Sequence, residues 1–382
     1  MRRLLVVISA IVFVDTTFYA VVAPLLPHYA DDLDLSKASA GILLAAYPAG
    51  TLAAALPSGV LASRIGPRRT VLAGLALLGA ASLGFAFASS VVLLDVARFV
   101  QGIGGACSWA GGLAWLVAEA PATRRAEMIG TALAAAIGGS LLGPVVGAAA
   151  AALGTRPVFG AVPIVAAGLA VAALRCPGGR RAEAGGATLR QTVAPTRVRL
   201  GMWLVALPGL GFGVLDVLVP LRLDDLGVAQ AAIAVAFLVS AAVEGAVSPV
   251  VGRIADRHGA MRPIRAGLLG ATGLVLLVPV PEVGVLCAAL LVATTAAFGA
   301  FWAPAMALLS EAAEEVGAHQ GLAFGLVNLA WATGMVAGAA GGGALAKATA
   351  DAAPYAVLSV LCAGTLALLT RRRRVALLTS AR

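Results

Sequence analysis

The chain has 382 residues, of which 60% are hydrophobic and only 12% are charged, whereas about 25% of the residues in an average soluble domain are charged. This composition excludes an ordinary soluble enzyme. The net charge of +9 would suggest a nucleic-acid partner in a soluble protein, but in a membrane chain the placement of basic residues sets the orientation, so we expect no nucleic-acid partner.

Long apolar segments separated by charges, prolines or glycine clusters predict twelve transmembrane helices, since about 20 apolar residues cross a hydrocarbon core of ~30 Å. In chain order they are 4–27, 38–62, 70–88, 91–118, 128–153, 157–174, 200–221, 229–252, 264–281, 284–310, 320–346 and 354–370. We interpret the first as a retained helix and not a signal peptide, because it lacks a small-residue cleavage site. The predicted fold class is an all-α integral membrane protein.

The lysine and arginine residues predict the orientation of these helices. Of the 27 Lys and Arg residues, 22 lie at the chain ends or in even-numbered connections, and only four lie in odd-numbered ones. Because basic loops stay in the cytoplasm, both termini of this multi-pass protein of the cell membrane are predicted to be cytoplasmic. Residues 176–199 predict a basic cytoplasmic linker between a bundle formed by residues 1–175 and a second bundle formed by residues 200–382.

An internal repeat relates the two predicted bundles. An offset of 193 residues aligns Asp31-Asp32 with Asp224-Asp225 and Trp109 with Trp302. An offset of 195 residues aligns Gly130, Gly139, Gly143 and Gly147 with Gly325, Gly334, Gly338 and Gly342. Two six-helix bundles related by a pseudo-twofold axis are the architecture of a secondary transporter that rocks around a central site.

A loop rich in glycine and arginine joins the second and third predicted helices. Its sequence, GVLASRIGPRR at 59–69, and its repeat copy, GRIADRHG at 252–259, resemble the G-x-L-A-D-R-x-G-x-R-R loop of the major facilitator superfamily. Its charges are expected to form a cytoplasmic latch that holds the outward-open state, although Ser63 replaces the usual aspartate; a basic loop that only sets topology is the alternative. The latch residues are Gly59, Arg64, Gly66, Arg68, Gly252, Asp256, Arg257 and Gly259.

Two further motifs extend this resemblance over essentially the whole chain. The segment RFVQGIGGA at 98–106 is similar to the fourth-helix motif R-x-x-x-G-x-G-x-A, whose arginine is linked to proton movement in related proton-coupled carriers. The fifth helix resembles the antiporter signature of drug:proton antiporters through Gly130, Gly139, Gly143, Pro144 and Gly147. Because small residues at every fourth position let another backbone approach, we expect a dry contact between this helix and a helix of the other half.

Four charged residues lie within the predicted helices, namely Asp15, Arg98, Asp216 and Glu244, and Asp95 is a borderline fifth. A buried arginine requires a partner, and Asp15 is the predicted partner, with Asp95 as its rival. Low-dielectric surroundings disfavour a charged carboxylate, so the three buried acids are candidates to exchange protons and, with Arg98, are the predicted proton-coupling residues. The alternatives are structural pairing of Asp15 with Arg98 and, for Glu244, exposure to water at the cytoplasmic mouth.

Aromatic residues at membrane depth are the candidates for a substrate cavity. They are Tyr19, Tyr47, Trp109, Phe298, Phe301, Trp302 and Trp331. Packing or a position at the membrane interface is the alternative for each of them.

The leading functional hypothesis is a secondary active transporter, a proton-coupled antiporter that exports small hydrophobic or cationic compounds by alternating access. It would be driven by the proton gradient without a cofactor, and we expect a monomer in the lipid bilayer. A sugar or metabolite exporter, or a proton symporter or uniporter of the same fold, is the alternative. A membrane-embedded enzyme is disfavoured because no DDxxD or HxxxH pattern occurs, and the four cysteines show no CxxC spacing that would indicate a metal site.

Overall fold

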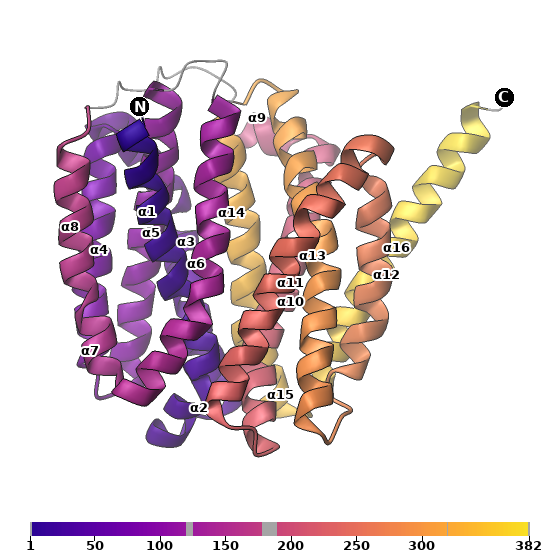
Figure 1. Cartoon of the computed structure of the whole chain (residues 1–382). Coiled ribbons are helices and arrows are strands. Elements are labelled where there is room, and N and C mark those ends of the chain that lie inside the picture. The colour runs from indigo at the N-terminus through magenta and orange to yellow at the C-terminus, as the bar shows by residue number, and fades with distance from the viewer. Residues whose placement is uncertain (1, 120–124, 178–188, 319, 381–382) are drawn as a thin grey trace.

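The computed structural model describes residues 2–119, 125–177, 189–318 and 320–380, and every element in this part of the chain is a helix (Figure 1). The first half contains α1 (Arg2–Ala20), α2 (Val22–Leu33), α3 (Lys37–Ile65), α4 (Pro67–Ala86), α5 (Val91–Glu119), α6 (Arg125–Leu153), α7 (Thr155–Gly160) and α8 (Val162–Leu174). The second half contains α9 (Leu189–Val193), α10 (Thr196–Asp225), α11 (Gln230–His258), α12 (Met261–Leu277), α13 (Gly284–Glu314), α14 (Gln320–Val336), the π-helix η2 (Ala337–Gly341), α15 (Gly342–Ala348) and α16 (Ala352–Ser380).

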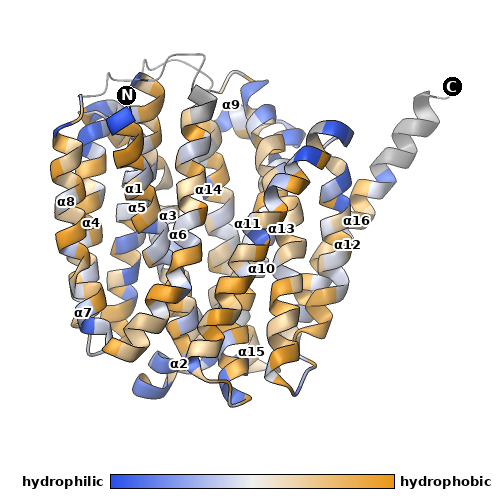
Figure 2. Cartoon of the chain, in the orientation of Figure 1, coloured by the Kyte–Doolittle hydropathy of each residue, from blue (hydrophilic) through white to orange (hydrophobic). Residues whose placement is uncertain are grey.

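Among the described residues, eleven helical segments are long and apolar enough to cross a membrane. The ninth predicted helix, expected over 264–281, ends four residues early: α12 has 17 residues and ends at Leu277, because Pro279 and Pro281 have no backbone N–H to continue its hydrogen-bond ladder. Apolar residues fill the middle of the helices and polar residues gather at the two ends of the molecule (Figure 2). The predicted all-α membrane fold with two bundles is confirmed.

The start of α1 and the end of α16 lie at the same end of the molecule (Figure 1). An even number of membrane crossings places both ends on one side, as the twelve predicted spans require. Part of the predicted linker, residues 178–188, lies outside the described residues.

Several predicted spans are broken helices. The first span divides into α1 and α2 at Val21. Pro24 has no N–H for the carbonyl of Ala20, so the α-helical ladder is interrupted there. The eleventh span contains η2, whose wider turn interrupts the regular ladder between α14 and α15.

The glycine stripe of α6 packs against α1, in the same half. A methyl group on Gly139 would collide with the carbonyl oxygen of Phe13, and one on Gly147 would lie 2.9 Å from the carbonyl oxygen of Val21. The expectation that this stripe contacts the other half is therefore wrong. Instead, α6 meets the other half through Ile137, which lies beside Gly245 of α11.

The repeat is visible in the contacts of the second half. A methyl group on Gly334 of α14 would collide with the carbonyl oxygen of Ala206 of α10, and one on Gly342 would lie 3.0 Å from a methyl carbon of Val214. These partners are the repeat equivalents of Phe13 and Val21. The glycines thus permit the same close crossing of two helices in each half.

The halves join closely at the end opposite the chain termini, where α2 and α15 lie (Figure 1). Lys37 of α3 donates to both carboxylate oxygens of Asp351, at 2.8 Å and 2.6 Å. Lys347 donates to Ser36 at 3.4 Å, and Gln230 donates to the carbonyl of Pro24. We call this end of the molecule the clasp end.

Candidate transport site

Asp15 is held in the interior of the first half by two donors. Its side chain is 1% exposed, and its Oδ2 accepts hydrogen bonds from the hydroxyl of Tyr47 at 2.8 Å and from the indole N–H of Trp109 at 3.0 Å. Its Oδ1 has no hydrogen-bond partner among the described residues. The carboxyl group therefore has one satisfied oxygen and one oxygen that is available to carry a proton.

Gly105 of α5 provides the space for this cluster. A methyl group at this position would collide with the Tyr47 hydroxyl and would lie 2.9 Å from Oδ1 of Asp15. The two glycines of the fourth-helix motif are Gly102 and Gly104, and Gly105 was not predicted to be a functional residue. The Gly104-Gly105 doublet opposite a buried acid is the signal that could have identified it.

Arg98 is not paired with Asp15, contrary to the sequence-based prediction. Among the described residues, its hydrogen bonds go to the carbonyl oxygens of Phe18 at 2.9 Å and Tyr19 at 3.1 Å and to Oε1 of Gln101 at 3.0 Å. Those carbonyls belong to the last turn of α1, which carries partial negative charge and lacks intrahelical donors where the helix ends. The helix break thus provides the partner that the buried arginine requires.

Tyr47 links the arginine and the acid. The guanidinium carbon of Arg98 lies 5.0 Å from the centre of the Tyr47 ring, and the hydroxyl of the same ring donates to Asp15. Gln101, which sequence reasoning missed, extends the network by donating to Ser82 at 2.9 Å. The rival partner Asp95 is not hydrogen-bonded to Arg98 in the described part of the chain, and its buried Oδ1 is unsatisfied.

Tyr19 lies where the two halves meet. Its ring centre is 5.2 Å from that of Tyr47 in the first half and 5.5 Å from that of Trp331 in the second half. Its hydroxyl contacts the sulfur of Met335, also in the second half, at 3.8 Å. Tyr19 therefore connects the Asp15 cluster to the opposite bundle.

The two acids of the second half face the same region. Asp216 and Glu244 are close enough to interact electrostatically with each other and with Tyr19. Gly299 of α13 makes room for Glu244, because a methyl group on Gly299 would lie 2.9 Å from the Glu244 Cγ. As residues, Asp216 and Glu244 are partly exposed, whereas Asp15 is buried.

Phe298 and Phe301 are packing residues of the second half. Both are 0% exposed; a methyl group on Gly211 would collide with the Phe298 ring, and one on Gly267 would lie 2.8 Å from the Phe301 ring. The prediction that they line a cavity is wrong for this conformation, because they have no accessible surface. Trp302 is partly buried and contacts Phe212, with ring centres 6.5 Å apart.

The predicted latch residues lie at the end that holds the chain termini. Gly66 and Gly259 have φ angles of +94° and +84°, so these repeat-equivalent turns require glycine.

Among the charged latch residues, Arg68 donates to the carbonyl of Leu174 in the same half at 2.6 Å. A methyl group on Gly59 or Gly252 would meet open space. The Arg64 and Arg257 side chains are exposed, and the side chain of Asp256 lies outside the described residues.

Comparison with known protein families decides the class. The model of the Major Facilitator Superfamily matches residues 8–207 and 201–381. The chain belongs to the major facilitator superfamily. Its family and its apolar helices make it a multi-pass membrane transporter.

Individual relatives resemble this transporter to different extents. Multidrug resistance protein 1 of Bacillus subtilis is 25% identical over 335 residues, which cover 85% of each chain. The MFS-type transporter ppzB of Metarhizium rileyi is 32% identical over 140 residues, or 35% of this chain and 29% of that protein. A probable vesicular acetylcholine transporter of Danio rerio is 32% identical over 37% of this chain and 31% of its own length. The matched region therefore spans less than a third of the latter two proteins.

Solved structures show the same fold. A bacterial homolog of the human lysosomal transporter Spinster, in an inward-facing and unoccupied conformation, aligns with a TM-score of 0.75 at 15% identity. The alignment covers 96% of this transporter and 94% of that chain. The nucleoside transporter NupG aligns equally well, with a TM-score of 0.75 at 10% identity over 96% of this transporter and 99% of that chain.

Proposed function

We propose that this transporter is a proton-coupled antiporter that exports small hydrophobic or cationic compounds. The observation that carries the proposal is the enclosed carboxyl of Asp15. Tyr47 and Trp109 donate to Oδ2 and stabilise the charged form, whereas Oδ1 is free to hold a proton. A carboxyl with this arrangement can load and release a proton without losing its position.

The aromatic groups and acids between the halves support a hydrophobic or cationic cargo. Tyr19 and Trp331 offer ring faces from opposite halves, and Asp216 and Glu244 supply negative charge in the same region. Aromatic faces and carboxylates attract organic cations and also bury apolar groups. The likeness to a multidrug resistance protein over most of both chains supports the same cargo class.

Arg98 is the residue through which proton loading would affect the conformation. It contacts the Tyr47 ring and the last turn of α1, and that turn carries Tyr19. Protonation of Asp15 would weaken the hydrogen bond that it accepts from the Tyr47 hydroxyl. The Tyr47 ring could then move relative to the Arg98 guanidinium that lies beside it. The α1 break would then transmit the change to the interface between the halves.

We further propose that the protein lies in the cell membrane as a monomer with both termini in the cytoplasm. The distribution of lysine and arginine supports this orientation. The clasp end would then face outward, and the conformation would be inward-facing, like that of the Spinster homolog. The proton gradient would drive transport, with no bound cofactor, and the latch loops would close the cytoplasmic end in the opposite state.

Inverted membrane vesicles that are energised to accumulate protons test the antiport. Addition of tetraphenylphosphonium should release protons from wild-type vesicles. Asp15→Asn should abolish this release at normal expression, whereas Asp95→Asn, which changes an acid outside the cluster, should retain it. The absence of a pH change with any transported compound would contradict antiport, and unaltered coupling in Asp15→Asn would assign the proton to Glu244.

Competition between cationic and neutral compounds for transport identifies the cargo class. Tetraphenylphosphonium uptake should be inhibited by other lipophilic cations and weakened by Glu244→Gln. Inhibition by neutral sugars alone would instead favour a sugar or metabolite exporter of the same fold. Proton uptake together with cargo would favour a symporter, and cargo movement that ignores the proton gradient would favour a uniporter.

A further inference from the structure

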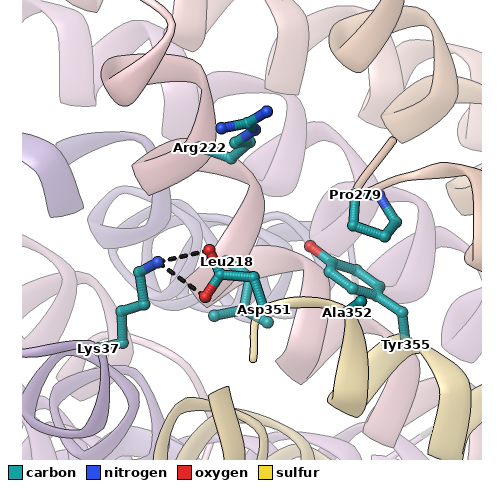
Figure 3. Close-up of a pocket in the computed structure, with 7 residues that line it drawn as sticks. All are labelled: Lys37, Leu218, Arg222, Pro279, Asp351, Ala352 and Tyr355. Carbon is teal, nitrogen blue, oxygen red and sulfur yellow. Dashed lines mark hydrogen bonds and ion pairs between the residues drawn. The ribbon is translucent and has the colours of Figure 1, made fainter. Parts of the chain in front are cut away.

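A cavity of about 260 Å³ lies at the clasp end, apart from the Asp15 cluster. The first half contributes Lys37 to its lining, and the second half contributes the rest (Figure 3). Those residues are Leu218, Arg222, Pro279, Asp351, Ala352 and Tyr355. The volume is slightly below that of typical drug-sized pockets, so the cavity suits a small ligand.

The polar groups of this cavity carry an excess of positive charge. Lys37 donates to both oxygens of Asp351, so the single acid of the lining is already paired. Among the described residues, Arg222 makes one hydrogen bond, from Nη2 to the carbonyl of Pro281 at 3.2 Å. A guanidinium has five N–H groups, and most of those of Arg222 are therefore left for a ligand.

Tyr355 completes the polar lining. The residue is 2% exposed, and its hydroxyl points into the space between Arg222 and Asp351 (Figure 3). Leu218, Pro279 and Ala352 supply apolar walls. A ligand that meets the Arg222 guanidinium and the Tyr355 phenol must present acceptor atoms and negative charge, and its remainder must be apolar to contact these walls.

We infer that this cavity binds a small carboxylate that has an apolar body. The carboxylate would lie against the Arg222 guanidinium and accept from Tyr355, while the apolar part would contact Leu218 and Pro279. Binding does not depend on which compound the transporter carries. It does depend on conformation, because Lys37 belongs to one half and the other lining residues belong to the second, so the ligand stabilises the state in which the clasp end is closed.

Calorimetric titration of the purified full-length protein tests the site, with sodium benzoate as the probe at fixed chloride concentration. Benzoate should bind saturably, and benzamide, its uncharged isostere, should not. Arg222→Gln should weaken binding about tenfold or more, as expected for loss of a charge-assisted hydrogen bond. Arg222→Lys should restore part of the affinity, and Arg156→Gln, which changes an arginine outside the cavity, should leave it unchanged.

Equal binding of benzoate and benzamide, no binding of benzoate, or unchanged benzoate affinity in Arg222→Gln would overturn the inference. The link to conformation has its own readout. With cysteines at Ser36 and Lys347, a short thiol-specific bifunctional reagent should cross-link the halves more completely in benzoate than in benzamide. An equal yield would overturn the coupling to the closed clasp end.

Discussion

Arg98 and Asp15 both contact Tyr47, but they do not contact each other. The Tyr47 ring lies beneath the guanidinium, and its hydroxyl donates to the carboxylate. The positive charge is instead satisfied by the carbonyl oxygens at the end of α1. Asp15 therefore has no direct ion pair. Because an adjacent positive charge would hold the carboxylate in its charged form, the absence of one allows Asp15 to bind and release a proton.

Removal of the Tyr47 hydroxyl should impair coupling while the ring packing is retained. Tyr47→Phe deletes one donor to Asp15 and keeps the ring beneath Arg98, and a hydrogen bond to a charged group is worth about 1.5–3 kcal/mol. We expect proton release on cargo addition to fall about 10- to 100-fold in inverted vesicles. The cluster would play no part in coupling if Tyr47→Phe transported like the wild type.

A methyl group at position 105 should displace the same cluster. Gly105→Ala would force the Tyr47 hydroxyl away from its position, and overpacking of this kind costs about 1–3 kcal/mol. We expect loss of proton-coupled transport with normal insertion into the membrane. Gly84→Ala on α4 is the matched control, because a methyl group there meets open space. Equal activity of the two variants would contradict the placement of Gly105.

The glycine stripe of α6 should act through stability within the first half. Gly139→Ala would press a methyl group against the Phe13 carbonyl, and Gly334→Ala would do the same to the Ala206 carbonyl in the second half. Both variants should lower the thermal unfolding midpoint of the detergent-purified protein, as followed by tryptophan fluorescence. Gly168→Ala, in open space on α8, should not. A proton leak at unchanged stability would instead indicate a seal between the halves.

The Lys37 and Asp351 pair should favour closure of the clasp end. Both side chains are partly exposed, at 33% and 48%, so the pair contributes only about 0.2–1 kcal/mol. Lys37→Asp should reduce cross-linking between positions 36 and 347, and the exchanged pair Lys37→Asp with Asp351→Lys should restore it. Failure of the exchanged pair to restore cross-linking would show that charge attraction does not hold this end closed.

Much of the architecture follows from the sequence, because the bilayer leaves few choices. Apolar segments must form helices that satisfy their own backbone groups, so hydropathy predicted the spans. The repeat predicted two related bundles, and the turns at Gly66 and Gly259 follow from motifs that need glycine. The ninth helix ends earlier than predicted because two prolines follow it.

Which side chains meet could be decided only by the tertiary structure. Hydropathy places Arg98 and Asp15 within the membrane, but it cannot reveal that the break at Val21 offers the arginine carbonyl partners. The glycine spacing identifies which face of α6 is packed, but it does not identify the helix that packs there. The structure shows that this helix is α1. Tyr355 and Arg222 line one cavity with Lys37 of the other half only because the bundles close at the clasp end. The sequence determined the helices and their repeat, since these depend on local composition, whereas contacts between distant segments depend on how the bundles pack.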